Sequence, residues 1–330
     1  MSLIKDIDLC GIGNSLLDIQ YLVTDDIISK LNIKKGEMRL VDSSFQNEII
    51  KNIGIKEEHR ASGGSAANTI IAYSQFGGSA AYNSKLGEDD YGKFYSKEFE
   101  DLGITLHYSK SKTESTGTCL VLISPDSERT MLTSLGASAS FGINDLSEEL
   151  IKRAKWLYIE GYKFSQESSS EAVFKAIETA KKCDTKVSFT FSDAFITEHF
   201  RMPVEECVRL SDLIFCNESE ALNFTQTNNI NDAIKVLESM TPNFAITRGK
   251  NGAIIKWNNE IFTTPSYPAN PVDSTGAGDI FAAGFFYGII KHNDAKFAGQ
   301  LGSYAGAKIV SQLGARFKEK HSSIIDFFIG

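Results

Sequence analysis

The sequence has few cysteines and no long hydrophobic run. Its five cysteines, Cys10, Cys119, Cys183, Cys207 and Cys216, are an odd number at scattered spacings, and none forms a Cys-x-x-Cys pair. This usage fits a reducing compartment. No apolar run reaches the ~18 residues of a membrane span, and acidic residues near the N-terminus argue against a signal peptide. We therefore expect a cytoplasmic protein with no membrane partner.

An excess of positive charge is also missing. The chain has 34 Lys and Arg against 42 Asp and Glu, a formal net charge of −8, and its lysine clusters are short. Nucleic acids and anionic membrane surfaces both require clustered Lys and Arg, so neither is expected as a partner. What the chain does have is 330 residues with 42% hydrophobic content, enough for one large α/β domain or a domain with an appendage.

Short apolar runs rich in β-branched residues alternate with longer amphipathic stretches along most of the chain. This alternation is typical of β-α-β units around a mainly parallel sheet, so the predicted fold class is α/β. The predicted strands are Ile7 to Ile12, Ala80 to Ser84, Trp156 to Ile159, Lys186 to Thr190, Leu213 to Cys216 and Phe244 to Thr247. The predicted helices are Ser65 to Gln75, Tyr91 to Leu102, Ser168 to Lys182, Asn231 to Met240, Gly276 to Ile290 and Ala295 to Gln312.

Two segments depart from this alternation. Residues 18–43 and 116–134 contain the strand-like runs "GEMRLVD", "TGTCLVLI" and "RTMLTSL", the last two joined by the turn "SPDSE". Such strands do not easily join a parallel sheet covered by helices. We expect them to form a small β layer that projects from a single domain of residues 1–330 and acts as a lid over a ligand. The alternative is an extra edge of the main sheet.

The stretch "DSTGAGDIFAAG" carries the most specific chemical signal. Gly276, Ala277 and Gly278 let the backbone approach a ligand closely, and Asp279 falls in the first turn of the helix that follows. Unpaired N–H groups and the positive end of the helix dipole favour an anion such as phosphate there. A carboxylate beside this anion site can accept a proton from a hydroxyl during phosphoryl transfer. The alternative is that Asp279 only favours the start of the helix.

Other nucleotide-binding motifs are missing from the sequence. There is no Gly-x-x-x-x-Gly-Lys-Ser/Thr, which excludes a P-loop, and "CGIGNSLL" lacks the third glycine of a dinucleotide fingerprint. A dehydrogenase is therefore disfavoured. Asp-Phe-Gly and His-Arg-Asp are also absent, which argues against a protein kinase.

The motifs resemble those of the ribokinase or PfkB family of carbohydrate and nucleoside kinases. "DSTGAGD" is similar to the family's carboxyl-terminal signature, "GGSAANT" to its substrate-side glycine motif, and "NESE" to its Asn-x-x-Glu motif. "TRGKNG" and "LGAR" resemble two further segments, in the family's order and across nearly the whole chain. The resemblance implies a ribokinase-like three-layer α/β/α sandwich with a small β-strand lid.

The resemblance also implies roles for residues around ATP. Asp279 would be the catalytic base, and Gly276, Ala277 and Gly278 would supply the backbone anion hole. ATP would be contacted by residues of two motifs, namely Asn217, Thr247, Gly249 and Gly252. Glu220 would help to hold Mg²⁺, mostly through water, as suits an ion that keeps several waters; the alternative for "NESE" is a helix cap. Asp273 and Thr275 would offer oxygens to a monovalent cation such as K⁺, as in some family members.

On the acceptor side, the resemblance implies hydrogen bonds to substrate hydroxyls. Asp18 in "GNSLLDI" matches the aspartate that binds these groups, and Asn14 lies just upstream. The further residues expected to bind the acceptor are Gly63, Gly64, Asn68, Arg129 and Tyr162. Arg129 matches a lid arginine that reaches the transferred phosphate, with an ordinary surface charge as the alternative. Tyr162 or Phe164 could stack on a purine, or either ring could simply fill the core.

The acceptor is the least determined feature. "GNSLLDI", "TGTCLVLI", "IEGYKFS" and "LIFCNESEA" are closest to the adenosine kinase branch, whereas Ser15 replaces a usual proline and Lys163 puts a charge where a second aromatic ring would help to form a base pocket. We expect an ATP- and Mg²⁺-dependent kinase acting on adenosine or a related nucleoside. A fructose- or ribose-type sugar kinase and a non-catalytic ligand-binding relative remain alternatives. A monomer or a homodimer formed through the lid would fit these branches.

Overall fold

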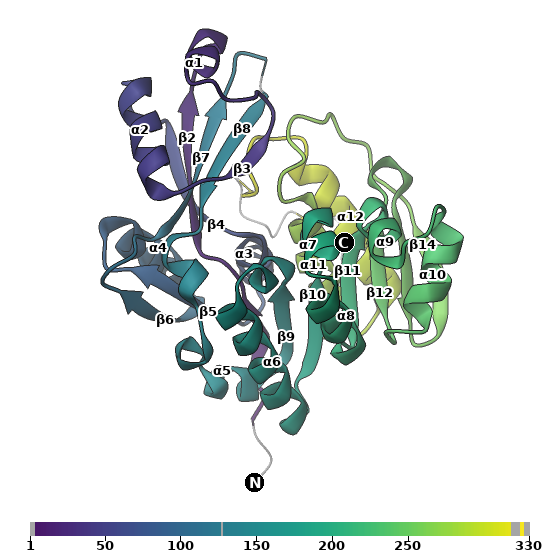
Figure 1. The fold of residues 1–330 in the computed structure, drawn as a ribbon. Helices are drawn as coiled ribbons and strands as arrows, with labels where there is room; N and C mark the ends of the chain where they lie inside the picture. The colour runs from purple at the N-terminus through teal and green to yellow at the C-terminus, as the bar shows by residue number, and fades with distance from the viewer. Residues whose placement is uncertain (1–3, 127, 318–323, 327–330) are drawn as a thin grey trace.

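A nine-stranded sheet runs through the larger part of the molecule (Figure 1). The structure is a computed structural model, and it describes residues 4–126, 128–317 and 324–326. The strand order is β14-β13-β12-β11-β10-β9-β1-β5-β6, parallel from β12 to β6 and antiparallel at β13 and β14. The bounds are β1 Ile7–Ile12, β5 Ala80–Gly87, β6 Thr105–Ser111, β9 Ala154–Glu160, β10 Lys186–Thr190, β11 Leu213–Asn217, β12 Phe244–Thr247, β13 Ala253–Trp257 and β14 Glu260–Thr264.

Helices cover both faces of this sheet. Alternate residues of β9 show why: Trp156 and Tyr158 pack into one buried cluster, and Leu157 and Ile159 pack into the other. The first cluster includes residues of α3 (Ser65–Gln75), α4 (Asp90–Asp101), α11 (Ala277–Tyr287) and α12 (Ala295–Ile309). The second includes residues of α5 (Glu148–Arg153), α6 (Glu167–Lys182), α7 (Ala194–His199), α8 (Arg201–Leu210), α9 (Glu218–Thr225) and α10 (Ile230–Glu238). The predicted three-layer α/β/α sandwich is confirmed.

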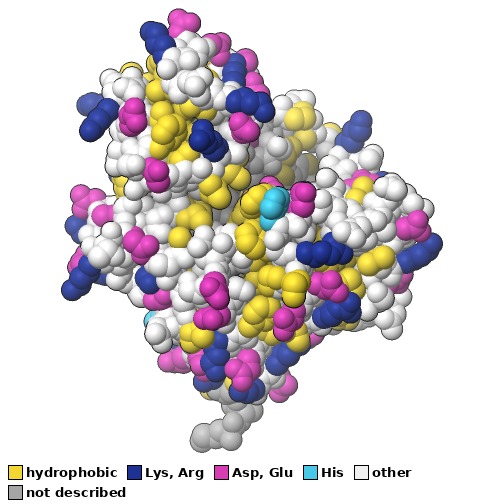
Figure 2. Space-filling model, in the orientation of Figure 1, with side chains coloured by type: hydrophobic (Ala, Val, Ile, Leu, Met, Phe, Trp, Pro, Cys, Tyr) yellow, Lys and Arg dark blue, Asp and Glu magenta, His cyan; other side chains and the backbone are white. Residues whose placement is uncertain are grey.

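A second, five-stranded sheet stands beyond one end of the main sheet (Figure 1). Its order is β3-β8-β7-β2-β4. The bounds are β2 Leu16–Leu22, β3 Met38–Leu40, β4 His59–Gly63, β7 Gly117–Ile123 and β8 Arg129–Ser134. The helices α1 (Asp25–Lys30) and α2 (Ser43–Ile53) pack on one face through a buried cluster that includes Ile19, Ile49 and Leu120. Figure 2 shows this part as a separate lobe with a hollow between it and the main body.

The other face of the small sheet turns toward the main domain. Asp18 lies beside Cys119 in the parallel pairing of β2 with β7, and Ile123 lies opposite Arg129 in the pairing of β7 with β8. Because side chains alternate along a strand, these residues share one face. Arg129 forms an ion pair with Asp273 of the main domain. This face therefore borders the predicted site.

The local structure follows the sequence signals closely at the six predicted helices, whereas α1, α2, α5, α7, α8 and α9 were not predicted. Each predicted helix begins within one residue of its expected start, and α11 passes into a π-helical turn, Gly288–His292 (η5). The strands β4 and β6 and the hairpin of β13 with β14 were not predicted, and the small sheet extends beyond the segment 18–43 to Gly63. The hairpin has a recognisable cause, since its turn residues Asn258 and Asn259 both adopt positive φ angles, which asparagine tolerates better than most residues.

Candidate active site

The segment before α11 forms a tight approach to the helix N-terminus. Gly276 has φ 76°, and a Cβ there would lie 2.4 Å from the Cβ of Ala315, so only glycine fits without a shift. The amide of Ala277 donates to the carbonyl oxygen of Ser274 at 3.2 Å. Among the described residues, the amides of Gly276, Gly278 and Asp279 have no hydrogen-bond partner. Of the three residues predicted to form the anion hole, only Ala277 has its amide engaged by another described residue.

Asp279 lies directly beside these amides and is held by the first turns of α3. Its Oδ1 accepts a hydrogen bond from Ser65 Oγ at 2.6 Å, and its Oδ2 accepts one from Asn68 Nδ2 at 3.0 Å. The residue as a whole is partly exposed, but its carboxyl group lies below the surface. Burial raises the pKa of Asp279 to about 6, against the lowering effect of the two hydrogen bonds. A carboxylate with this pKa is suited to accept a proton near neutral pH.

The predicted hydroxyl-binding residues converge on the same region. Asp18 on β2 packs against Gly63 on β4, where a Cβ would lie 2.6 Å from Asp18 Oδ2. Gly64 has φ 107°, and a Cβ there would lie 2.0 Å from the carbonyl oxygen of Asn14. Both glycines therefore serve close approach rather than flexibility. Burial raises the pKa of Asp18 to about 6, and the positive charges of Arg129 and Arg316 offset part of that rise.

Asn14 follows β1 and is fixed at three atoms. Its amide donates to Glu160 Oε1 at 3.3 Å, its carbonyl oxygen accepts from Tyr82 OH at 3.1 Å, and its Oδ1 accepts from Lys163 Nζ at 3.0 Å. Lys163 is 1% exposed. The charge of Lys163 therefore points into the protein, where internal hydrogen bonds hold it.

Glu160 is a further residue of this region that the sequence reading missed. It ends β9, and its Oε2 accepts a hydrogen bond from the amide of Ala66 at 2.9 Å. The N-cap of α3 is Gly64, which has no side chain, so Glu160 supplies the capping oxygen from another strand. Burial raises the pKa of Glu160 and lowers that of Lys163. The position of Glu160 at the carboxyl end of a parallel strand was the signal that could have revealed it.

The nucleotide-side motif "NESE" forms a helix cap. Asn217 Oδ1 accepts from the amide of Glu220 at 2.8 Å, while Glu220 Oε2 accepts from the amide of Asn217 at 2.9 Å and Oε1 from its Nδ2 at 2.8 Å. This capping box starts α9. Glu220 is 8% exposed, and burial raises its pKa to about 7. Both of its oxygens are engaged, so a cation would be held through water more readily than directly.

No cluster of three or more His, Cys, Asp or Glu side chains suited to a metal ion occurs in residues 4–126, 128–317 and 324–326. Mg²⁺ in phosphoryl-transfer sites commonly uses one or two carboxylates, water and the substrate phosphates. A single buried carboxylate at Glu220 fits that donor set.

The second nucleotide-side motif, "TRGKNG", forms a turn after β12. Gly249 has φ 53°, and Gly252 has φ 76° with its Cβ position 2.0 Å from the carbonyl oxygen of Thr264. The turn is closed by a hydrogen bond of 2.8 Å from the amide of Arg248 to the carbonyl oxygen of Gly252. Thr247 ends β12 and is paired with Asn217 in the register of β11 with β12. The two nucleotide-side motifs therefore lie on neighbouring strands.

Two arginines link the small sheet to the main domain. Arg129 on β8 is paired with Asp273, whose carboxylate also accepts from the amides of Thr275 at 2.9 Å and Gly314 at 2.8 Å. Arg316 donates to the carbonyl oxygen of Ser62 on β4. The side chain of Arg129 is 8% exposed, so it is not the ordinary surface charge that was the alternative.

The two candidate aromatic residues differ. Phe164 is 3% exposed and packs against Phe174 and Phe189, so it belongs to the core. Tyr162 is partly exposed and packs against the edge of the same core cluster, and the charges of Asp193 and Asp279 add to the effect of burial in raising its pKa.

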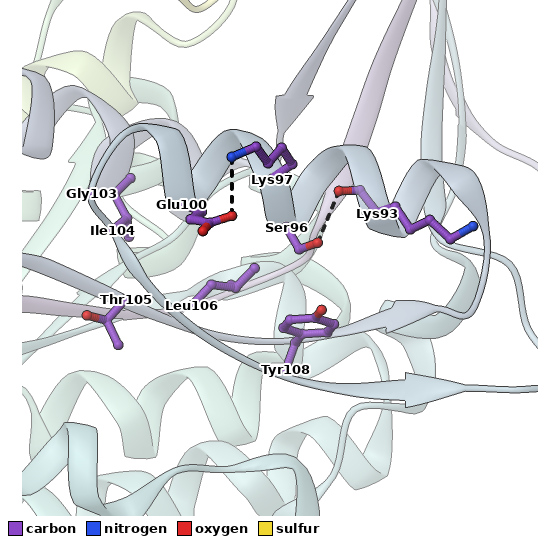
Figure 3. A pocket seen from close by; sticks show the side chains of 9 residues that line it. All are labelled: Lys93, Ser96, Lys97, Glu100, Gly103, Ile104, Thr105, Leu106 and Tyr108. Carbon is purple, nitrogen blue, oxygen red and sulfur yellow. Dashed lines mark hydrogen bonds and ion pairs between the residues drawn. The ribbon is translucent and has the colours of Figure 1, made fainter.

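A surface pocket of about 710 Å³ lies elsewhere, between α4 and the edge strand β6 (Figure 3). Its lining includes Lys97, which is paired with Glu100, together with Leu106 and Tyr108. None of the predicted site residues lines it. It therefore has no part in the chemistry considered for Asp279.

Comparisons with known proteins agree with this arrangement. The family described as "pfkB family carbohydrate kinase" matches residues 40–321. The chain belongs to the pfkB family. Its curated relatives include adenosine kinase 2 of Arabidopsis thaliana, 27% identical over 337 residues that cover 94% of this chain and 96% of the relative.

Two solved structures extend the likeness to the whole fold of this pfkB kinase. A probable sugar kinase from Rhizobium etli CFN 42 is 28% identical with a TM-score of 0.90, covering 98% of this chain and 99% of the other. The adenosine kinase from Sinorhizobium meliloti is 26% identical with a TM-score of 0.89 at the same coverage. This protein is thus an ATP-dependent kinase with an alcohol group as acceptor. None of its described helices has the length and apolar character needed to cross a membrane.

Proposed function

We propose that this pfkB kinase transfers the γ-phosphoryl group of ATP to a primary hydroxyl of an adenosine-like nucleoside, with Asp279 as the base. The observation that supports this most directly is the position of Asp279. Its carboxylate lies beside the free amides at the start of α11, and its pKa is raised to about 6. A base and a site for developing negative charge are thereby adjacent.

The proposed transfer forms one bond, breaks one bond and moves one proton. The acceptor hydroxyl oxygen forms a bond to the γ-phosphorus, the bond from that phosphorus to the bridging oxygen of ADP breaks, and the hydroxyl proton passes to Asp279. The amides of Gly278 and Asp279 would stabilise charge on the transferring group. Ser65 and Asn68 keep the carboxylate oriented through their hydrogen bonds of 2.6 and 3.0 Å.

ATP would lie along the neighbouring ends of β11 and β12. We assign Asn217, Thr247, Gly249 and Gly252 to its phosphates and base, and Glu220 to Mg²⁺ through water. Mg²⁺ would supply charge neutralisation on the phosphates. A monovalent cation near Asp273 and Thr275 is part of the proposal, although the ion pair of Asp273 with Arg129 already places a positive charge there.

On the acceptor side, Asp18, Asn14, Gly63 and Gly64 would bind the sugar ring of the nucleoside, and the small sheet would close over it as a lid. The adenosine kinases among the relatives favour a nucleoside. A sugar kinase is the second candidate, because a solved sugar kinase is equally similar in fold.

The test is a measurement of ADP release with ATP, Mg²⁺ and a panel of acceptors that contains adenosine, other nucleosides, ribose and fructose. We expect adenosine to give the highest kcat/KM. Highest turnover with a free sugar would replace the first candidate by the second, and binding without turnover of any acceptor would favour the non-catalytic alternative.

Asp279→Asn tests the base itself. This variant should lower kcat by about 10³-fold or more while adenosine still binds, because the amide cannot take the proton. The matched control is Asp101→Asn, which changes an exposed aspartate that pairs with Lys97 on α4. If Asp279→Asn kept the wild-type rate, the mechanism would be wrong.

A further inference from the structure

Lys163 is a buried cation beside the acceptor side. Its hydrogen-bond partners are neutral oxygens, and the negative charges of Glu160 and Asp145 favour its charged form. Its side chain is 1% exposed and lies in the short helix η3 (Gly161–Ser165). Nζ donates to Asn14 Oδ1 at 3.0 Å and to the carbonyl oxygen of Ser138 at 2.9 Å, and it lies 4.8 Å from the centre of the Phe141 ring. Burying an ammonium group is costly, and these contacts offset only part of the cost. The role of Lys163 is therefore to be found in the two groups that it hydrogen-bonds, Asn14 and Ser138.

We propose that Lys163 is a positioning residue that fixes Asn14 as a hydrogen-bond donor toward the acceptor, so that the site selects acceptors with two neighbouring hydroxyl groups. This rests on the proposed function. An ammonium group has only donors, so the amide atom that faces it has to be Oδ1. The Nδ2 group of Asn14 consequently points away from Lys163, and it has no partner among the described residues.

Hydrogen bonds fix the backbone of Asn14 and Ser15, so only the side chain of Asn14 could change its orientation. The amide of Ser15 donates to Ser138 Oγ at 3.0 Å, and Ser138 Oγ donates to the carbonyl oxygen of Ser15 at 3.2 Å. The amide of Asn14 is held by Glu160. An unrestrained asparagine could present either its oxygen or its NH₂ group by rotating its amide. Lys163 removes that choice.

The two hydrogen-bonding groups of the acceptor side, Asp18 and Asn14, then require opposite partners. The carboxylate of Asp18, when ionised, only accepts hydrogen bonds, and Asn14 Nδ2 only donates them. One hydroxyl of a vicinal pair can donate to Asp18, and the oxygen of its neighbour can accept from Asn14. An acceptor that lacks one of these hydroxyls leaves a buried polar group unpaired, which costs affinity.

The experiment measures binding and turnover of adenosine, 2′-deoxyadenosine and 3′-deoxyadenosine by the wild type, Lys163→Met, Asn14→Ala and the double variant. In the wild type, we expect at least one deoxy analogue to bind about tenfold or more weakly than adenosine. Lys163→Met should weaken adenosine binding about tenfold, bring the ratio of adenosine to deoxy affinities close to one, and leave the KM for ATP within about twofold. Lys182→Met, an exposed lysine on α6, is the control that should match the wild type.

The double variant distinguishes a role of Lys163 in positioning Asn14 from a general loss of structure in the Lys163→Met variant. Asn14→Ala should lose the same discrimination, and Lys163→Met should add little to it, since the two residues act through one contact. The proposal is overturned if Lys163→Met discriminates as well as the wild type, or if it lowers acceptor affinity equally with Asn14 present and absent. If the wild type acts on a sugar and not on nucleosides, the proposed acceptor fails, and the same ratios measured with that sugar and its deoxy forms still decide the role of Lys163.

Discussion

The acceptor side and the nucleotide side of the candidate site are held together in different ways. On the acceptor side, the contacts join distant parts of the chain, as in the bonds from Ser65 to Asp279 and from Lys163 to Asn14. On the nucleotide side, each motif forms its own cap or turn, as in the capping box of Asn217 with Glu220, three residues apart, and the ion pair of Arg248 with Glu218 joins the two motifs. The acceptor side thus depends on how several elements pack, whereas the nucleotide side depends on short segments that form their own geometry.

Both sides contain buried carboxyl groups, and on the nucleotide side burial raises the pKa of Glu220 to about 7. Burial raises the pKa values of both Asp18 and Asp279 to about 6, and the negative charge of Asp18 raises that of Asp279 further. Raised carboxyl pKa values mean that ionisation is resisted by the folded protein. On both sides, ionised carboxylates are therefore kept at the expense of folding stability, which is a common property of active sites.

Apart from the loss of the base itself, the largest effect on the acceptor side is expected from Gly64→Ala. A Cβ at this position would lie 2.0 Å from the carbonyl oxygen of Asn14, and the φ of 107° is one that alanine rarely adopts. We expect the loop of Asn14 and the start of α3 to separate, with a loss of about 100-fold or more in kcat/KM. Steady-state kinetics of the purified variant will measure this.

The control for that prediction is Gly103→Ala. Gly103 also has a positive φ, 71°, but no atom lies within 4 Å of its Cβ position. Its backbone cost is smaller, since a φ of 71° lies close to the left-handed region that alanine can adopt, and there is no clash, so kcat/KM should stay near the wild-type value. Equal losses in the two variants would show that backbone strain, and not the contact with Asn14, causes the effect.

A pair of substitutions should separate the two sides kinetically. Asp18→Asn should raise the KM for the acceptor by about 10- to 100-fold and leave the KM for ATP nearly unchanged, because one buried acceptor of hydrogen bonds is replaced by a donor. Thr247→Val, at the end of β12, should raise the KM for ATP alone. If either variant changed both KM values equally, the division of the site into two sides would not hold.

The division also explains what the sequence could and could not predict. Caps and turns such as "NESE" and "TRGKNG" are determined by residues next to one another, so their motifs indicated their positions and their local form. The motif order indicated that Asn68 and Asp279 belong to one site, and the structure places their side chains 3.0 Å apart. Glu160 and the inward turn of Lys163 were missed, because both depend on the packing of η3 and α3 against the loop after β1.

The pH dependence of activity should reflect the protonation of the carboxyl groups on the acceptor side. Asp279 has to be ionised to accept a proton, and burial raises its pKa from 3.8 to about 6. Activity should therefore be nearly constant above about pH 7 and fall about tenfold per pH unit below 6. Protonation of Asp18 over the same range would steepen the fall in kcat/KM. A profile that stays flat to pH 5 would contradict the assignment of Asp279 as the base.

The same raised pKa has an opposite effect on stability. Because folded Asp279 binds its proton more tightly than the unfolded chain does, its stabilising contribution is complete below about pH 4 and is lost as pH rises through about 6. Asp279→Asn should accordingly raise the unfolding temperature at pH 8 and change it less at pH 5. Thermal unfolding followed by circular dichroism at the two pH values will measure the difference.

The smallest expected effect is on the nucleotide side, where Asn217→Ala removes the cap of α9. Loss of an asparagine N-cap costs about 1 kcal/mol of stability. Asn229→Ala is the matched control, since Asn229 caps α10 by the same type of bond, accepted from the amide of Asp232 at 3.0 Å. Both variants should lose similar stability in denaturant unfolding, and only Asn217→Ala should raise the KM for ATP, by about tenfold or less. Because the cap is local, the KM for the acceptor should not change in Asn217→Ala. If the KM for the acceptor rose as much as the KM for ATP, the nucleotide side would be coupled to Asp279 as tightly as the acceptor side is.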